Sequence, residues 1–188
     1  MQRLKTEVRQ RIYAAALAEF RKCGYADASV RVIAENADIS LGNIYRYFAN
    51  KEALYLAVVQ PFRNTIKEFC EEQYAILGKT CEELSADILK FIEEHAHEFE
   101  IVVKGNSHYE LSFMEFMVEM TSTKIARVVD EKMWQFGKQP NADGFYKVVA
   151  GSFLNAMIEV FKAEVDRESK LSNLTNLMLF YFGQPGKD

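Results

Sequence analysis

The sequence is poor in the residues that interrupt helices, and it has no long apolar run. Its 188 residues include three prolines and nine glycines. No segment alternates apolar and polar residues cleanly enough to predict a strand. Because no apolar run reaches the roughly 20 residues that a transmembrane helix needs, a membrane-spanning chain is excluded. The first residues carry charge but no apolar core and no small-residue cleavage site, so we expect no secretory signal.

Cysteine and histidine are equally scarce. The cysteines are odd in number and show no CxxC spacing, which disfavours a disulfide framework or a zinc knuckle and favours a reducing cytoplasm. We interpret them as small buried or half-buried residues, with a redox sensor as the alternative. Two of the histidines, His95 and His97, point to different faces of a helix, so we expect no metal site. The cysteines are Cys23, Cys70 and Cys81.

Common catalytic motifs are missing as well. The chain contains no HExxH, GxSxG or Walker A sequence. Cys70 and Cys81 near His95 offer a nucleophile and a base, but nothing in the spacing specifies their geometry. The sequence therefore predicts neither a catalytic residue nor a cofactor.

The first 60 residues and the rest of the chain differ in the sign of their net charge. Residues 1–60 hold nine Lys or Arg and six Asp or Glu, a balance of +3. Residues 61–188 hold fourteen Lys or Arg and twenty-one Asp or Glu, a balance of −7. A basic head on an acidic body is typical of a protein that touches a polyanion with one end, and an ordinary solvated surface is the alternative.

What is present is helical periodicity along most of the chain, which predicts an all-α fold. At 49% apolar residues, the chain can bury the core of one domain, or of one domain and a small module. The predicted helices cover residues 6–23, 29–37, 40–48, 50–77, 80–95, 96–104, 107–136, 143–164 and 168–182.

Start and stop signals mark the first of these helices. Ser29, Ser40 and Asn50 have the side chains that cap helix N-termini. Gly24 ends the first helix, and Asp38 can occupy a left-handed turn between two short helices.

Two signals further along are also specific. Thr80 and Glu83 have the spacing of a capping box. Pro61 either kinks the fourth helix or begins a new segment.

Residues 29–48 predict a helix-turn-helix, which is a short helix, a tight turn and a second short helix after a longer one. If Ile44 and Phe48 point inward, the polar and aromatic side chains around them remain outside. Asn can read adenine, Arg can read guanine or grip phosphate, and Tyr hydroxyls can bond phosphate. A helical hairpin without DNA contacts is the alternative. The side chains left outside are Asn43, Tyr45, Arg46 and Tyr47.

Residues 6–60 also carry a set of small, apolar and aromatic residues at fixed spacing. They resemble the N-terminal DNA-binding region of the TetR family of bacterial transcriptional regulators. The resemblance implies an all-helical homodimer whose C-terminal domain usually binds a small effector. The matching residues are Ile12, Ala15, Ala16, Phe20, Gly24, Tyr25, Ser29, Val30, Ile33, Ala34, Ser40, Gly42, Tyr45, Tyr47, Phe48, Lys51 and Leu54.

The resemblance assigns DNA contacts residue by residue. It places Ser29, Val30 and Arg31 on DNA at the start of the second helix, and Lys51 on a phosphate. Asp38 replaces the usual turn glycine, and Leu41 stands where Lys is frequent, which removes one phosphate contact. The residues that belong to the recognition helix are Leu41, Gly42, Asn43, Tyr45, Arg46 and Tyr47.

Residues 61–188 are expected to form the effector-binding and dimerisation domain, after a DNA-binding domain of residues 1–60. The helix over 143–164 is apolar nearly all round, so it needs two partners, one of which can be a second subunit. A buried core helix in a monomer is the alternative. The residues predicted to form the dimer interface are Phe145, Val149, Phe153, Met157, Val160, Leu171, Leu174, Met178 and Tyr181.

Residues 99–136 are dense in Met and aromatic side chains. Flexible Met among rigid rings suits an adaptable apolar pocket and equally suits an ordinary core. The pocket interpretation depends mainly on the family resemblance, and it extends to two residues of the following helix. The predicted effector-binding residues are Phe99, Tyr109, Phe113, Phe116, Met117, Met120, Trp134, Phe153 and Met157.

Together these patterns predict a cytoplasmic, effector-responsive transcriptional regulator. We expect a repressor that binds a palindromic operator in double-stranded DNA as a homodimer, with one recognition helix in each of two successive major grooves. One alternative is a DNA-bound scaffold or activator whose C-terminal domain binds a protein. Another is a helical enzyme or ligand carrier that has lost DNA binding.

Overall fold

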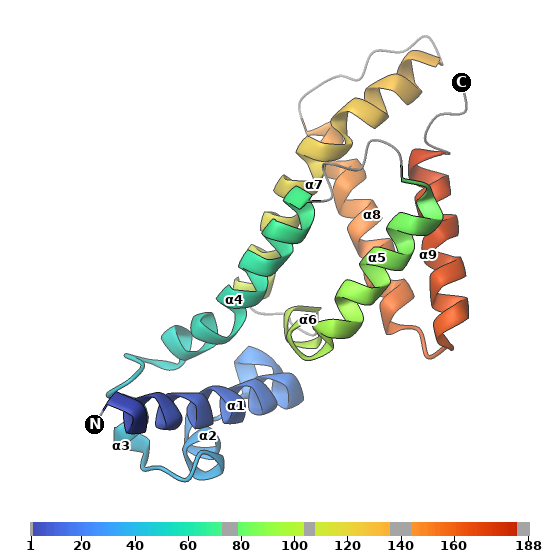
Figure 1. The fold of residues 1–188 in the computed structure, drawn as a ribbon. Helices are drawn as coiled ribbons and strands as arrows, with labels where there is room; N and C mark the ends of the chain where they lie inside the picture. The colour runs from blue at the N-terminus through green and yellow to red at the C-terminus, as the bar shows by residue number, and fades with distance from the viewer. Residues whose placement is uncertain (1, 73–78, 104–107, 136–143, 184–188) are drawn as a thin grey trace. The chain divides into compact units, whose positions relative to one another are not determined.

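The computed structural model describes residues 2–72, 79–103, 108–135 and 144–183 (Figure 1). Within these ranges the secondary structure is helical and no strand occurs, which confirms the expected all-α fold. No helix in the described ranges combines the length and apolar character that crossing a bilayer demands. In chain order the helices are α1 Gln2–Asp27, α2 Val30–Asn36, α3 Leu41–Ile44, α4 Lys51–Glu72, α5 Cys81–Glu94, α6 Ala96–Val103, α7 His108–Gln135, α8 Phe145–Lys162 and α9 Arg167–Phe182.

The chain divides into two compact units. The first comprises Met1–Glu68 and His95–Leu111, and the second comprises Phe69–Glu94 and Ser112–Asp188. Helix α4 contributes to both units, and α6 belongs to the first. The functional boundary expected near residue 60 stays a prediction.

The first unit is built around α1, which packs on α2 and α6, while α2 packs on α3. Its centre contains edge-to-face aromatic pairs, Phe20 with Tyr55 at 5.1 Å and Tyr25 with Tyr55 at 4.9 Å between ring centroids. Such pairs contribute about 0.5–1.5 kcal/mol beyond the apolar area they bury. The other buried apolar residues here include Ile12, Ala16, Ile33, Ala34, Ala37, Ile44, Phe48, Leu54, Val58, Ile101 and Val102.

Regular helix is interrupted at Gly24, where the sequence predicts that the first helix ends, and one further turn follows within α1. Gly24 has φ 72° and ψ 175°, a backbone conformation that glycine adopts without a Cβ clash. The amide of Ala28 donates to the carbonyl of Gly24 at 3.2 Å, so helical bonding resumes for one turn up to Asp27. The glycine therefore marks a kink within α1.

Helix α6 is attached to α1 by packing and by an ion pair. Ile101 and Val102 are buried, and Arg21 Nε donates to Glu100 Oε2 at 2.7 Å. Both charged side chains are part-exposed, so the pair adds less than about 1 kcal/mol, and apolar burial provides most of the attachment.

In the second unit, α9 packs on both α5 and α8, as Figure 1 shows. One apolar cluster joins these three helices through Cys81, Phe153 and Met178. A second cluster joins α7 and α8 through Ile125 and Ala150. Long apolar faces thus hold this unit together.

The helix starts of the second unit follow local chemistry. The predicted capping box is present, because Thr80 N donates to Glu83 Oε2 at 2.7 Å and Glu83 N donates to Thr80 Oγ1 at 3.2 Å. The last helix begins after Asp166, whose carboxylate accepts from Ser169 N at 2.9 Å. In the first part of the chain, α4 continues across Pro61, so no new segment begins at the proline.

Candidate nucleic-acid interface

The start of α2 confirms the N-cap predicted at Ser29. Ser29 has extended backbone angles, and its Oγ accepts from Val32 N at 3.5 Å. Its own amide donates to Glu19 Oε1 at 3.0 Å, and Glu19 is only 6% exposed. Of the predicted contact residues in this segment, Val30 is half-buried and Arg31 is exposed.

The turn between α2 and α3 has the left-handed residue that the sequence predicts. Asp38 has φ 53°, and Ile39 N donates to Ala34 O at 3.1 Å. Arg11 Nη1 lies 3.6 Å from Asp38 Oδ2, with both side chains at the surface, so this pair adds little stability.

Helix α3 is shorter than the predicted helix over 40–48. Ser40 caps it, with Asn43 N donating to Ser40 Oγ at 3.3 Å, but regular helix ends at Ile44. Arg46 N and Tyr47 N then donate to carbonyls three residues back, at 3.2 and 2.8 Å. This tighter winding turns the chain toward α4, which Asn50 caps by accepting from Ala53 N at 2.8 Å. Residues 41–48, which we call the recognition segment, are therefore one helical turn followed by a tight turn.

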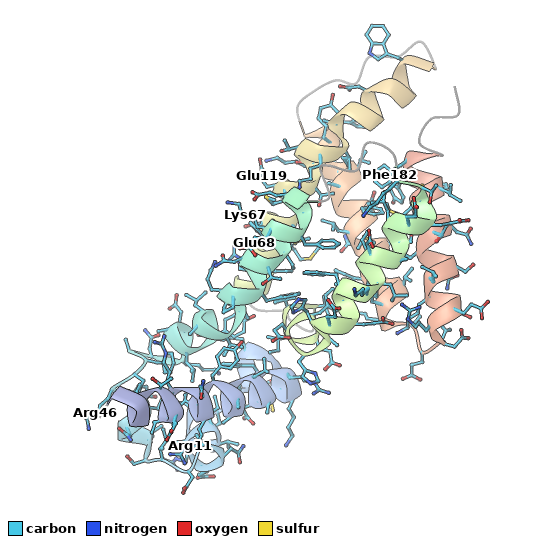
Figure 2. All side chains as sticks on the ribbon, in the orientation of Figure 1. Arg11, Arg46, Lys67, Glu68, Glu119 and Phe182 are labelled. Carbon is cyan, nitrogen blue, oxygen red and sulfur yellow. The ribbon has the colours of Figure 1, made fainter. Side chains whose placement is uncertain are left out.

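The recognition segment has one buried face and one open face. Ile44 and Phe48 are buried, as predicted, while Arg46 is exposed and Tyr45 is 47% exposed. Figure 2 shows Arg46 projecting outward from the ribbon. Leu41, Asn43 and Tyr47 are half-buried, and a Cβ on Gly42 would meet nothing within 4 Å. The open face thus has donors, aromatic edges and a stretch of bare backbone.

Two cations at this end of the molecule lie against aromatic rings. Lys51 Nζ donates to Ala26 O at 2.9 Å and lies 4.9 Å from the centroid of Tyr25, which ties the start of α4 to the end of α1. This bond uses one of the three N–H donors of the ammonium group. The guanidinium of Arg9 lies 5.9 Å from the ring centroid of Phe48. Sequence reasoning missed Arg9, because nothing local indicates which ring a helix residue will meet.

The predicted effector residues fall in several places. Phe153 and Met157 belong to the cluster of α5, α8 and α9, and Trp134 is 61% exposed. Phe99 is half-buried on α6 in the first unit, and the side chain of Tyr109 lies outside the described residues. The effector pocket stays a prediction. The remaining members all lie on α7 and are buried or half-buried: Phe113, Phe116, Met117 and Met120.

Three of the nine predicted dimer residues are buried within their own chain, and the other six are half-buried. Phe153, Leu174 and Met178 are buried, because α9 uses its apolar stripe to cover α5 and α8. The large apolar side chains that α8 and α9 expose are Val148, at 69%, and Phe180, at 76%. The interface assignment stays a prediction. Its half-buried members are Phe145, Val149, Met157, Val160, Leu171 and Tyr181.

The titratable groups support a structural role for two cysteines. Burial raises the pKa of Cys70, with Lys124 opposing and Glu71 adding to the rise. Burial and then Glu82 raise the pKa of Cys81, whose thiol lies 3.2 Å from Gly183 O. Because the thiolate is the reactive form, raised pKa values disfavour redox sensing. Among the described residues, no three His, Cys, Asp or Glu side chains gather as a metal site.

The known proteins that this chain resembles include bacterial transcriptional regulators. The family model of bacterial regulatory proteins, tetR family, matches residues 12–58. The chain is 30% identical over 87 residues to the HTH-type transcriptional regulator YdgC of Bacillus subtilis, covering 46% of this chain and 45% of that protein. It is 27% identical over 159 residues to YvkB of the same organism, covering 79% and 82%. It is 42% identical over 53 residues to the HTH-type transcriptional repressor KstR of Mycolicibacterium smegmatis, covering 28% and 26%.

Solved structures share the fold along nearly the whole chain. A transcriptional regulator from Aquifex aeolicus superimposes with a TM-score of 0.66 at 17% identity, over 93% of this chain and 99% of that one. A TetR-like regulator from Rhodococcus gives 0.62 at 17% identity, over 90% and 92%. The family model thus covers the helix-turn-helix and its surroundings, while the shared fold covers 90% or more of the chain.

Proposed function

Because this chain belongs to the TetR family of bacterial regulatory proteins, we propose that it is a repressor that binds a palindromic operator as a homodimer and releases it on binding a small effector. The family consists of transcriptional regulators rather than enzymes, and its members usually bind DNA as dimers. Similarity to the repressor KstR supports repression. A regulator of this kind works where the DNA is, so we also propose that the protein is cytoplasmic.

The observation that carries the proposal is the two-faced recognition segment. Ile44 and Phe48 anchor it in the core, which leaves Arg46 and about half of the surface of Tyr45 exposed on the other face. Arg46 has the donors to read guanine in the major groove or to bind phosphate. Gly42 offers close backbone approach to DNA, because nothing lies within 4 Å of where its Cβ would be.

The dimer surface that we propose is the exposed face of α8, together with Phe180 of α9. Along α8 the exposed residues recur at helical spacing, and Val148 supplies the large apolar side chain. A monomer gains nothing from exposing Phe180, whereas a second copy would bury its ring. Of the residues predicted for this interface, Phe153, Leu174 and Met178 are already buried in the chain's own core, and the half-buried members stay part of the proposal. The exposed residues of α8 are Lys147, Val148, Ser152, Asn155, Glu159 and Lys162.

The effector site is proposed along α7. Phe116, Met117 and Met120 are half-buried there, so they remain available to line a cavity of adaptable shape. To release DNA, an effector must bind one arrangement of the two heads better than the other. A hundredfold preference would supply about 2.7 kcal/mol of coupling.

Selection of duplexes from a random DNA library, followed by footprinting, tests the proposal. We expect a palindromic consensus with half-sites about 34–36 Å apart along the duplex. Arg46→Ala is expected to weaken binding about 5- to 150-fold, since a bidentate arginine–guanine contact is worth about 1–3 kcal/mol. Arg167→Ala is the matched control, because Arg167 pairs with Glu93 in the second unit. A chain that selects no consensus would contradict the proposal.

A further inference from the structure

Helix α2 begins with an N-cap but without the second, reciprocal bond of a capping box. In a capping box, the residue three positions after the cap is Glu or Gln, and its side chain accepts from the cap's own amide. Here the cap is Ser29 and the residue three positions later is Val32, which has no acceptor in its side chain. The local bond that the Ser29 side chain accepts, from Val32 N to Ser29 Oγ, is long at 3.5 Å.

Helix α5 shows the complete arrangement in the same chain. Thr80 N donates to Glu83 Oε2 at 2.7 Å, while Glu83 N donates to Thr80 Oγ1 at 3.2 Å. Both partners belong to one helix start, so this capping box fixes only the local backbone. It does not fix the position of α5 against another helix.

At α2 the carboxylate comes from a different helix. Glu19 of α1 accepts the amide of Ser29 on Oε1 at 3.0 Å. Glu19 is 6% exposed and its neighbour Phe20 is fully buried, so water has little access to replace the bond. A buried carboxylate that loses its donor is strongly unfavourable, which makes the bond a tight constraint on where α2 begins relative to α1.

We propose that Glu19 is a positioning residue for DNA recognition. The inference rests on the proposed function, because the segment that Glu19 holds carries Ser29, Val30 and Arg31. Helix α2 also packs on α3, so a shift at its start reaches the recognition segment. Glu19 is buried and does not itself contact DNA. It acts by holding α2 in one register, and a retained acceptor at this position is sufficient.

Three substitutions separate the acceptor from the charge and the side-chain length. Glu19→Gln keeps an oxygen acceptor and removes the charge. Glu19→Leu keeps the approximate size and removes the acceptor. Glu19→Asp keeps the charge but shortens the reach by one methylene, and it stays testable if the leucine variant fails to fold. The probe is the duplex that the unaltered full chain selects from a random library, measured with proteins shown to be folded by circular dichroism.

We expect Glu19→Gln to bind this duplex within about threefold of the unaltered chain. Glu19→Leu and Glu19→Asp should bind at least tenfold more weakly and discriminate less against a scrambled duplex. Amide exchange at Ser29, followed by NMR, should stay slow in the glutamine variant and become fast in the other two. Rescue by glutamine is the result that a general loss of stability would not produce.

Glu83→Leu is the matched control, since it breaks the same kind of bond at α5. It should lower the melting temperature and leave the DNA affinity of the folded protein unchanged. Glu19→Leu or Glu19→Asp binding as tightly as the unaltered chain would overturn the inference, as would a glutamine variant as weak as the leucine one. If the unaltered chain selects no duplex while Ser29 exchange still follows the predicted order, the proposed function fails and the inference fails with it. Normal selection with unaltered Ser29 exchange in Glu19→Leu rejects the inference alone.

Discussion

The two units of the chain differ in how much their helices depend on caps and how much on long buried apolar faces. In the first unit, α2, α3 and α4 each begin with a side-chain oxygen that accepts from a backbone amide, supplied by Ser29, Ser40 and Asn50. In the second unit, α5, α8 and α9 share an apolar cluster, and charged pairs such as Arg167–Glu93 lie at the surface. Short helices such as α3 gain little from propagation, so they depend on caps and on the core beneath them. The longer helices α5 and α9 also begin with caps, at Thr80 and Asp166, but they bury long apolar faces in addition.

The largest effect should come from the aromatic centre of the first unit. Phe20 is fully buried and meets Tyr55 edge-to-face. Phe20→Ala should lower the free energy of unfolding by about 3–5 kcal/mol. Hydrogen exchange should show lost protection in α1 and α2 while α5 and α9 keep theirs.

Leu174→Ala is the counterpart in the second unit, with an expected loss of about 2–5 kcal/mol. Leu174 is fully buried on α9. Protection should then fall in α5, α8 and α9 first. If either variant lowers protection equally in both units, the units fold as one body and the comparison fails.

The next effect concerns association rather than folding. Phe180 is 76% exposed, so Phe180→Ser should change the unfolding free energy of a monomer by no more than about 0.5 kcal/mol. If a second copy covers the ring, the substitution should weaken self-association about tenfold or more, as expected for an aromatic anchor. Sedimentation velocity across a concentration series measures this. Unchanged association would exclude Phe180 from the interface.

A smaller effect is expected at the cap of α2. Ser29→Ala removes the oxygen that accepts from Val32 N, and cap losses of this kind lower stability by about 1 kcal/mol. Because the amide of Ser29 remains bonded to Glu19, the loss should be at the low end of the cap range. Chemical denaturation of Ser29→Ala, of Glu19→Leu, which removes the acceptor, and of the double variant measures the coupling. Independent, additive losses would show that the two bonds do not share this helix start.

Local chemistry predicted the first unit well because its signals lie within three or four residues of one another. The caps at Ser29, Ser40 and Asn50 and the left-handed Asp38 need no knowledge of the rest of the chain. The predicted length of α3 was wrong, since the chain leaves the regular helix at Ile44 and reaches the start of α4 through a tight turn. Glu19 was missed because its partner, ten residues away, lies across a kink that the sequence shows only as a glycine.

Periodicity in the second unit indicates which helix face is apolar but not what covers it. Leu174 and Met178 lie on a stripe that suits a symmetric partner equally well, yet α5 and α8 of the same chain occupy it. The start of α9 at Asp166 was also missed, although its bonds to Ser169 are local. The predicted helix begins at residue 168, whereas α9 begins at Arg167 with Asp166 as its cap.

The smallest predicted effect has the opposite sign to the others and concerns Ser85 of α5. Its hydroxyl is fully buried and makes no hydrogen bond to the part of the chain that the structure describes. The buried side chains of Cys81 and Leu89 lie one helical turn before and after it. An unpaired buried hydroxyl is unfavourable by about 1–3 kcal/mol, while Ser85→Ala leaves a void no larger than one oxygen atom. We therefore expect Ser85→Ala to stabilise the protein by about 0.5–1 kcal/mol, a rise of about 1–4 °C in melting temperature by calorimetry. A loss of stability instead would mean that the hydroxyl has a partner, and that the core of the second unit is held by a polar contact as well as by its apolar clusters.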